Sequence, residues 1–268
     1  MKKNKNTLIK ILLIICLLFG LYNFLNIIKW NKDNRDTSNL YQDIITNIEI
    51  EEIDGFNSLF INPDDDKNSS YWYYSSMKMI DVDFEDLSTK NNDVIGWIQV
   101  PGTNIDYPFV QTKDNKFYLN HSFDKSYNDA GWIFMDYRNN NLSDKNNILY
   151  GHARKDGTMF GSLKKTIKKD WFNNKDNHIV KISTPTENSI WQIFSIYYIE
   201  TESYYITVNF KDDVEFQKYI DKSLSRSVYK FDANVNIADT ILTLSTCYGE
   251  TKKLVLQAKL IKKEIKSS

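Results

Sequence analysis

The chain has 268 residues, of which 41% are hydrophobic and 26% are charged, and its formal net charge is −1 at pH 7. This balance excludes a globally basic chain, so nothing in the overall charge indicates nucleic-acid binding. The length supports one globular domain of about 200 residues preceded by an N-terminal extension. Aromatic residues are abundant, whereas only 4 Pro and 9 Gly occur, which favours a strand-rich fold over disorder.

The N-terminus combines lysines with an apolar run. Lysines stand at positions 2, 3, 5 and 10, and residues 11–22 are apolar, with a looser extension over residues 7–28. A cleaved signal peptide is the alternative, but no Ala-x-Ala-like site follows the run. Because flanking lysines stay in the cytoplasm, we expect residues 1–30 to form a cytoplasmic tail and a single-pass membrane signal anchor. The remainder of the chain would then lie outside the cell.

Residues 31–90 are polar and carry a weak helical pattern of apolar residues between Leu40 and Ile48. The run Asp64-Asp65-Asp66 lacks the twelve-residue loop of a calcium site, and we interpret it as a solvated turn. Residues 83–87 predict a short helix. We therefore expect residues 31–90 to be an N-terminal helical extension.

Strand-like segments dominate from Val94 onward, and two helical segments interrupt them. The alternating or apolar runs that predict strands are residues 96–100, 105–111, 131–135, 147–152, 178–183, 189–198, 240–247 and 253–261. Helices are predicted over residues 159–171 and, from an amphipathic pattern that includes Val214 and Leu224, over residues 212–224. Many short strands joined by turns indicate a mainly β fold, either a barrel or a sandwich with helical decoration.

A cysteine ends one of these strands. If Leu242 and Leu244 face the core, Cys247 lies on the more polar face, where the strand runs out and a thiol is reachable. The other cysteine, Cys16, lies in the apolar N-terminal run and cannot pair with it. A lone cysteine is more often a small buried hydrophobe. An unpaired cysteine in an exported domain is nevertheless a candidate nucleophile, and we treat Cys247 as one.

One of the three histidines fits as a partner for this thiol. His152 follows a buried-looking strand and Gly151, and it precedes a glycine-containing loop, where a side chain is held yet exposed. We interpret His121 and His178 as surface residues. An imidazolium near a thiol lowers the pKa of the thiol, and it can protonate a leaving amine. The sequence therefore predicts a Cys247–His152 pair brought together by the fold.

Acyl transfer at such a thiol also needs a cation or a backbone donor for the oxyanion. Lys252 and Lys253 follow Cys247 past a turn, and a paired strand would return them close to it; the spacing also fits a solvated strand start. The basic residues farther on we interpret as a solvated strand edge: Lys259, Lys262, Lys263 and Lys266. Metal-ligand spacings and phosphate-loop or dinucleotide fingerprints are absent, so we expect no metal and no cofactor.

The pentapeptide Thr-Leu-Ser-Thr-Cys at residues 243–247 resembles the TLxTC signature of sortases, the cysteine transpeptidases of Gram-positive cell surfaces. Further blocks resemble the class B branch, and the resemblance runs from about Val94 to Ile261. These blocks are residues 104–111, 114–121, 133–139, 148–152 and 155–161.

The resemblance implies a mainly β, sortase-type closed β-barrel over residues 91–268, with N-terminal helices and a helix before the last strands. It implies that surface proteins with a C-terminal sorting signal, of the Asn-Pro-x-Thr-Asn or a related type, are cleaved after Thr. Cys247 would form the acyl-enzyme, and the acceptor would be an amine of the peptidoglycan precursor. No cofactor is implied.

His152 and Cys247 match the family's His and Cys, whereas the family's third residue, an Arg on the strand after the Cys, has no match. Lys253 is the nearest residue; Arg154 and Arg226 are weaker candidates. Lys keeps the charge of Arg but lacks its planar fork. The residues expected to line the substrate groove are Ser245, Thr246, Tyr248 and Asn104. The alternative to an enzyme is a sortase-like surface scaffold or binding protein whose activity was lost with the Arg.

Overall fold

The structure is a computed structural model that describes residues 2–200, 202–248 and 252–266; of residues 2–6, 247 and 248 it describes the backbone only. The α-helices are α1 (Lys2–Thr46), α2 (Ser70–Ser75), α3 (Glu85–Lys90), α4 (Lys169–Asn173) and α5 (Asp213–Arg226). The strands are β1 (Ile50–Ile53), β2 (Leu59–Phe60), β3 (Met79–Val82), β4 (Val94–Val100), β5 (Ile105–Val110), β6 (Phe134–Met135), β7 (Asn146–Tyr150), β8 (Ile179–Ser183), β9 (Glu187–Glu200), β10 (Ile241–Tyr248) and β11 (Lys252–Ile265). Short 3-10 helices are η1 (Phe117–Leu119), η2 (Gly161–Lys165), η3 (Lys175–Asn177) and η4 (Tyr204–Ile206).

The strands close into a barrel in the order β10-β7-β6-β5-β4-β8-β9-β11, and β11 pairs again with β10. Most neighbours are antiparallel, but β10 with β7 and β5 with β6 are parallel. Strand β2 extends the sheet on β11, and β1 pairs with β3 in a small separate sheet. The prediction of a mainly β, closed barrel is confirmed.

The barrel interior is packed with large apolar side chains. Trp97, Trp191, Leu242, Leu244 and Leu256 are fully buried there. Each such side chain contributes about 1.5–3 kcal/mol relative to an exposed position. The strand ends that carry the site are thus held by a dense core, and Leu242 and Leu244 meet the condition of facing it.

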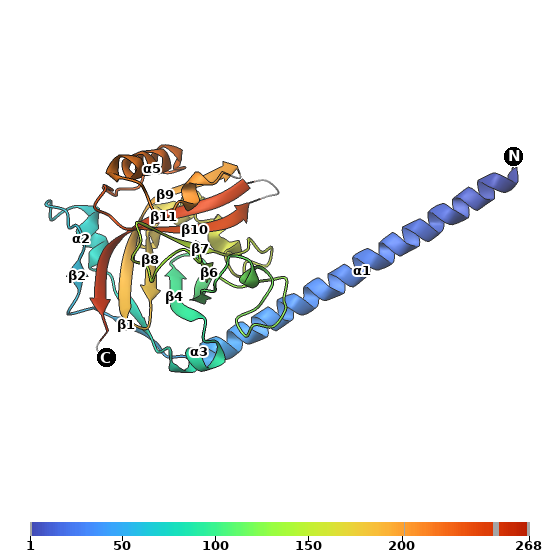
Figure 1. The fold of residues 1–268 in the computed structure, drawn as a ribbon, viewed down its shortest axis with the longest axis horizontal. Coiled ribbons are helices and arrows are strands. Elements are labelled where there is room, and N and C mark those ends of the chain that lie inside the picture. The colour runs from blue at the N-terminus through green and yellow to red at the C-terminus, as the bar shows by residue number, and fades with distance from the viewer. Residues whose placement is uncertain (1, 201, 249–251, 267–268) are drawn as a thin grey trace.

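Helix α5 covers the outer face of the barrel over β9 and β10 (Figure 1). The side chain of Asp212 caps the helix by accepting a hydrogen bond of 2.8 Å from the Glu215 backbone N–H. Phe216 and Ile220 pack against Ile241 of β10. The face of β10 that looked more polar in the sequence is therefore also buried, because a helix covers it.

Two elements are shorter than the sequence predicts. Gly131 has a φ of +61°, outside the range of a strand, so only residues 134–135 of the expected strand pair as β6. Met159 has a φ of +51°, so a helix cannot begin there; η2 and α4 follow as separate short pieces. In α5, Val214 and Leu224 are exposed although the pattern placed them on the apolar face.

Helix α1 runs without a break from the apolar N-terminal segment onto the barrel, leaving it near α3 as a long straight helix (Figure 1). Its apolar part is exposed and has a mean hydropathy of 2.5, enough in length and composition to cross a membrane. The C-terminal part of α1 packs against the barrel: Ile44 is fully buried, and the ring centres of Tyr41 and Tyr107 lie 4.6 Å apart. The boundary predicted at residue 30 thus falls inside one helix.

The interpretation of the C-terminal lysines as a solvated edge is wrong for two of them. Lys259 and Asp239 are both buried, and Lys259 Nζ lies 3.7 Å from Asp239 Oδ2. Lys262 donates a hydrogen bond of 2.8 Å to the Asp54 carbonyl. Burial lowers the pKa of Lys262. The reason is topological: β11 is not an edge, since it pairs along its length with β9 and on its other side with β10 and β2.

His178 is also not the surface residue that the sequence indicated. Its ring is buried between Tyr74, whose hydroxyl lies 3.2 Å from Nδ1, and the Phe172 carbonyl, 2.8 Å from Nε2. The ring of Phe172 stacks on it. Burial lowers the pKa of His178, so the residue packs as a neutral aromatic.

Candidate active site

A pocket of about 240 Å³ lies where β7 and β10 end. Four residues predicted for the site line it: His152, Ser245, Thr246 and Lys253. The other lining residues are Asn115, Leu119, Phe134, Tyr150, Gly151 and Tyr205. The fold therefore gathers the candidate acid/base, a cation and the end of the cysteine-bearing strand around one opening.

The parallel pairing of β7 and β10 brings the histidine to the cysteine-bearing strand. Tyr150 is the register partner of Ser245, and the Gly151 N–H donates a hydrogen bond of 3.3 Å to the Ser245 carbonyl. His152 follows this last pair on β7, and Cys247 lies two residues past it on β10. Because both strands run in the same direction, their ends meet at the same edge of the barrel.

The His152 ring is fixed by the backbone opposite it. Its Nε2 lies 2.7 Å from the Leu119 carbonyl oxygen, which can only accept, so Nε2 carries the hydrogen. Nδ1 is then the nitrogen left to exchange a proton. A Cβ on Gly131 would lie 2.9 Å from Cδ2 of this ring and 2.5 Å from the Tyr118 carbonyl, so only glycine allows this close approach.

The hairpin of β10 and β11 separates the two candidate lysines. Cys247 is the register partner of Lys253, and Tyr248 is that of Lys252. The side chains of Cys247 and Tyr248 lie outside the described part of the chain. Lys253 lines the pocket, whereas Lys252 lies 3.6 Å from Glu200 and is half exposed. The register therefore favours Lys253 as the cation of the site.

The other candidates predicted from the sequence lie elsewhere. Arg154 pairs with Asp156 at 3.0 Å, and Arg226 lies 3.4 Å from Glu202. The Asn104 side chain accepts a hydrogen bond of 2.7 Å from Lys165 Nζ. None of these three is among the described residues that line the pocket.

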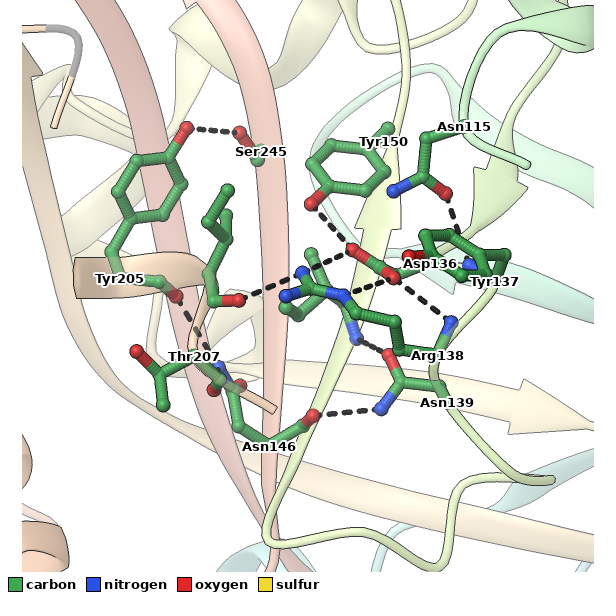
Figure 2. Close-up of polar contacts among 12 residues, drawn as sticks. Asn115, Asp136, Tyr137, Arg138, Asn139, Asn146, Tyr150, Tyr205, Thr207 and Ser245 are labelled. Atoms are coloured by element: carbon green, nitrogen blue, oxygen red, sulfur yellow. Dashed lines mark hydrogen bonds and ion pairs between the residues drawn. The ribbon is translucent and has the colours of Figure 1, made fainter. Parts of the chain in front are cut away.

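A buried carboxylate supports the pocket wall (Figure 2). Asp136 is fully buried and accepts hydrogen bonds of 2.8 and 2.7 Å from Nε and Nη2 of Arg138. It also accepts one of 2.8 Å from the Tyr150 hydroxyl. Burial raises the pKa of Tyr150, and the charge of Asp136 adds to this, so the phenol stays protonated and donates. Although burial opposes it, the bonds from Arg138 hold the pKa of Asp136 below its ordinary value.

The same network reaches the opposite wall. Arg138 Nη2 donates a hydrogen bond of 2.9 Å to the Ile206 carbonyl in η4. The neighbouring Tyr205 points its hydroxyl at the hydroxyl of Ser245, 3.1 Å away (Figure 2). The ion pair of the buried Asp136 with the partly exposed Arg138 thus links the loop after β6, the end of β7 and η4 to the strand that carries Cys247.

Several lining residues were missed by the sequence reasoning. Tyr150 had a usable signal, because it stands two positions before His152 in a strand and so shares a face with it. Asn115 and Leu119 lie inside one of the blocks that carry the family resemblance. Tyr205 had no signal, since it lies in η4, outside any alternating pattern.

The described lining residues offer an imidazole and an ammonium group, and the backbone of β10 brings Cys247 to the same edge of the barrel. Within residues 2–200, 202–248 and 252–266 no group of three or more His, Cys, Asp or Glu residues is placed to hold a metal ion. Leu119 and Phe134 contribute apolar walls, and the hydroxyl groups of Tyr150 and Tyr205 make hydrogen bonds within the protein. Such a site suits acyl transfer through a thioester.

Comparisons with known proteins identify the family. The sortase domain profile matches residues 98–261. Sortase B of Listeria monocytogenes is 39% identical over 186 residues, which cover 68% of this chain and 75% of the relative. Sortase B of Staphylococcus aureus is 40% identical over 185 residues, covering 67% and 75%. The solved Staphylococcus aureus sortase B–substrate complex matches with a TM-score of 0.63 at 38% identity, covering 67% of this chain and 84% of the other. These likenesses disfavour a scaffold without activity. The chain belongs to the sortase family, in its class B branch, and is a cysteine transpeptidase.

Proposed function

We propose that this sortase cleaves a C-terminal sorting signal of the Asn-Pro-x-Thr-Asn type after Thr, and transfers the surface protein to an amine of the peptidoglycan precursor. The observation that carries the proposal is the shared pocket of His152, Ser245, Thr246 and Lys253, with Cys247 as the next residue of β10. Two similar solved structures support it: one is a complex of Staphylococcus aureus sortase B with substrate, and the other is a complex of a sortase B with triglycine.

Each residue takes one role in the proposed reaction. The thiolate of Cys247 attacks the carbonyl carbon of the signal's Thr, and the ammonium of Lys253 stabilises the oxyanion. Nδ1 of His152 protonates the leaving amine, and a thioester on Cys247 remains. The incoming amine then attacks the thioester carbonyl, and its proton returns to His152 as the thiolate leaves.

We propose further that α1 anchors the enzyme in the membrane as a single pass, with the N-terminus in the cytoplasm and the barrel outside. The exposed apolar segment of α1 and the lysines at its start support this orientation. Sortases act at the cell surface, where their substrates meet the cell wall. Because α1 continues onto the barrel, the site would lie at a fixed height above the membrane.

The test uses the full chain in detergent micelles, a peptide containing Asn-Pro-Gln-Thr-Asn and triglycine, with mass spectrometry of protein and products. We expect a thioester on Cys247, release of the fragment after Thr, and an amide with triglycine; Cys247→Ala forms none of these. Cleavage at another bond contradicts the proposed signal. Absence of a thioester with a library of sorting-signal peptides contradicts the proposed function.

A further inference from the structure

A second cleft, of about 530 Å³, lies on the other side of His152, between α1 and the barrel. His152 lines both this cleft and the pocket that contains Ser245 and Lys253. The residues of the cleft that matter here are Lys29, Trp30 and Asp33 from α1, and Asp129, His152 and Arg154 from the barrel. One acid/base residue thus separates two openings, and a transpeptidase has two substrates.

A primary ammonium group already lies in this cleft. Lys29 Nζ is 2.6 Å from Asp129 Oδ2 and 5.1 Å from the centre of the Tyr127 ring. Tyr127 also donates a hydrogen bond of 2.7 Å to the other oxygen of Asp129. The bonds from Lys29 and Tyr127 hold the pKa of Asp129 below its ordinary value, and the charged form of His152 acts in the same direction. The cleft therefore accepts an alkylammonium close to the catalytic imidazole.

Asp33 provides a second carboxylate. The residue is only 9% exposed and lines the cleft. Its backbone carbonyl accepts hydrogen bonds from Thr37 and Asn128, but its carboxylate makes no hydrogen bond or ion pair with the described residues. At longer range the carboxylate of Asp33 also attracts the ammonium group of Lys29. The carboxylate of Asp33 thus lines the cleft with no hydrogen-bond donor of the described residues on it, so a cation that enters the cleft can pair with it.

We propose that Asp33 and Asp129 form the binding site for the ammonium group of the acyl acceptor, and that Lys29 occupies this site until the acceptor displaces it. This inference rests on the proposed transpeptidation, and it names the acceptor as a primary amine that approaches from the side of α1. The Lys29–Asp129 pair is half exposed, and such a pair exchanges partners at little cost.

The atoms and charges of the second half-reaction then balance. The bound acceptor loses one proton to solvent and becomes a free amine, and its nitrogen attacks the thioester carbonyl carbon. The carbon–sulfur bond breaks, the Cys247 thiolate leaves, and an amide forms. The second proton of the nitrogen passes to His152, which restores the imidazolium–thiolate pair. The two carboxylates raise the local concentration of the acceptor and do not touch the reacting carbonyl.

The test measures the second half-reaction of the full chain in detergent micelles with two nucleophiles, triglycine and hydroxylamine. Triglycine carries an ammonium group, whereas hydroxylamine is mostly uncharged at neutral pH. For Asp129→Asn and Asp33→Asn, we expect the half-saturating triglycine concentration to rise by about fivefold, the effect of losing one carboxylate that pairs with the acceptor's ammonium group in an open cleft. We expect the half-saturating hydroxylamine concentration to move by less than about twofold.

For Lys29→Met, we expect the half-saturating triglycine concentration to change in the opposite direction. If Lys29 competes with the acceptor, its removal lowers the half-saturating triglycine concentration; if the Lys29–Asp129 pair only supports the fold, Lys29→Met and Asp129→Asn weaken the reaction together. Asp43→Asn is the matched control, because it removes another ion pair of 2.6 Å made by α1, that with Lys90 of α3, away from the cleft. We expect Asp43→Asn to leave both nucleophiles unaffected.

Equal losses with triglycine and hydroxylamine, or a loss in Lys29→Met, overturn the ammonium site. Unchanged triglycine dependence in both Asp variants overturns it as well. Failure of the proposed function is distinguishable, because the wild-type protein then forms no thioester with sorting-signal peptides before any acceptor is added.

Discussion

The two sides of His152 are built in different ways. On the side of the pocket, Tyr150 and Tyr205 are fixed by hydrogen bonds that lead to the buried Asp136 and its partner Arg138. On the side of α1, Lys29 and Asp129 pair with about half of each side chain exposed. Buried, fully bonded groups keep one geometry, whereas exposed pairs exchange partners. The comparison indicates a rigid wall on the side of the acyl donor. On the side of the acceptor it indicates an ion pair that can exchange its partner.

The largest effect is expected at the residue that the two sides share. We expect His152→Gln to slow thioester formation by about 100- to 10,000-fold, because the leaving amine loses its proton donor. Single-turnover mass spectrometry with the peptide substrate measures this rate.

His121→Gln is the matched control for this substitution. The ring of His121 stacks on Phe117 at 4.0 Å, and among the described residues it does not line the pocket. We expect the rate of thioester formation in His121→Gln to stay within about twofold of the wild-type rate. Equal losses in the two variants contradict the assignment of His152 and, with it, the division of the site into two sides.

The next largest effect concerns the cation on the rigid side. We expect Lys253→Met to lower the rate of thioester formation by about 10- to 100-fold, since the oxyanion loses a nearby positive charge. Lys253→Arg keeps the charge and is expected to retain most of the rate. Lys252→Met is the control, because Lys252 pairs with Glu200 away from the pocket. A loss in Lys252→Met that matches the one in Lys253→Met excludes Lys253 as the stabilising cation.

The barrel and part of the site could be predicted from local patterns. Alternation along residues 241–247 indicated which side chains enter the core, and Leu242 and Leu244 do so. His152 was recognised because a buried strand followed by glycine indicates a rigid strand end. The family resemblance supplied the closed barrel and the helix before the last strands, and the register of β10 and β11 then favoured Lys253 over Lys252.

The remaining features depend on contacts between distant segments. Lys259 looks like any other lysine of a basic tail, and only the pairing of β11 on both sides together with Asp239 explains its burial. Tyr205 reaches Ser245 because Arg138 holds the Ile206 carbonyl. No periodicity encodes that three-part contact. The cleft beside His152 forms only because α1 continues past residue 30 and docks on the barrel.

A stability effect is expected from breaking the Asp136–Arg138 pair under the rigid wall. Arg138→Met leaves the carboxylate of Asp136 buried with fewer partners, and we expect a loss of about 2–3 kcal/mol at pH 7. This lies at the lower end for a buried pair, because the Arg138 side chain is 39% exposed. Denaturant unfolding measures it, and Arg226→Met, which removes an exposed pair with Glu202, is expected to cost less than about 0.5 kcal/mol.

The pH dependence of the same variant has a definite sign. In the wild type the pKa of Asp136 is lowered in the fold, so its contribution is present above the unfolded pKa of about 3.9 and is lost as pH falls through the folded value. Without Arg138, burial raises the folded pKa, and protonation relieves the penalty as pH falls towards 4. The stability gap between variant and wild type should therefore shrink from pH 7 to pH 4. A gap that is constant with pH contradicts the ion-pair explanation.

The smallest effect tests whether the rigid wall acts on the substrate or only on the fold. Tyr205→Phe removes one hydroxyl and its 3.1 Å contact with Ser245, a change of about 1 kcal/mol. If Tyr205 positions Ser245 against the sorting signal, we expect KM for the peptide to rise about three- to fivefold while kcat changes less. Tyr137→Phe, at a half-exposed position outside the described pocket lining, is the control. A loss in unfolding free energy without a change in KM would mean that η4 is held for stability alone, and the donor side would then be as adaptable as the acceptor side.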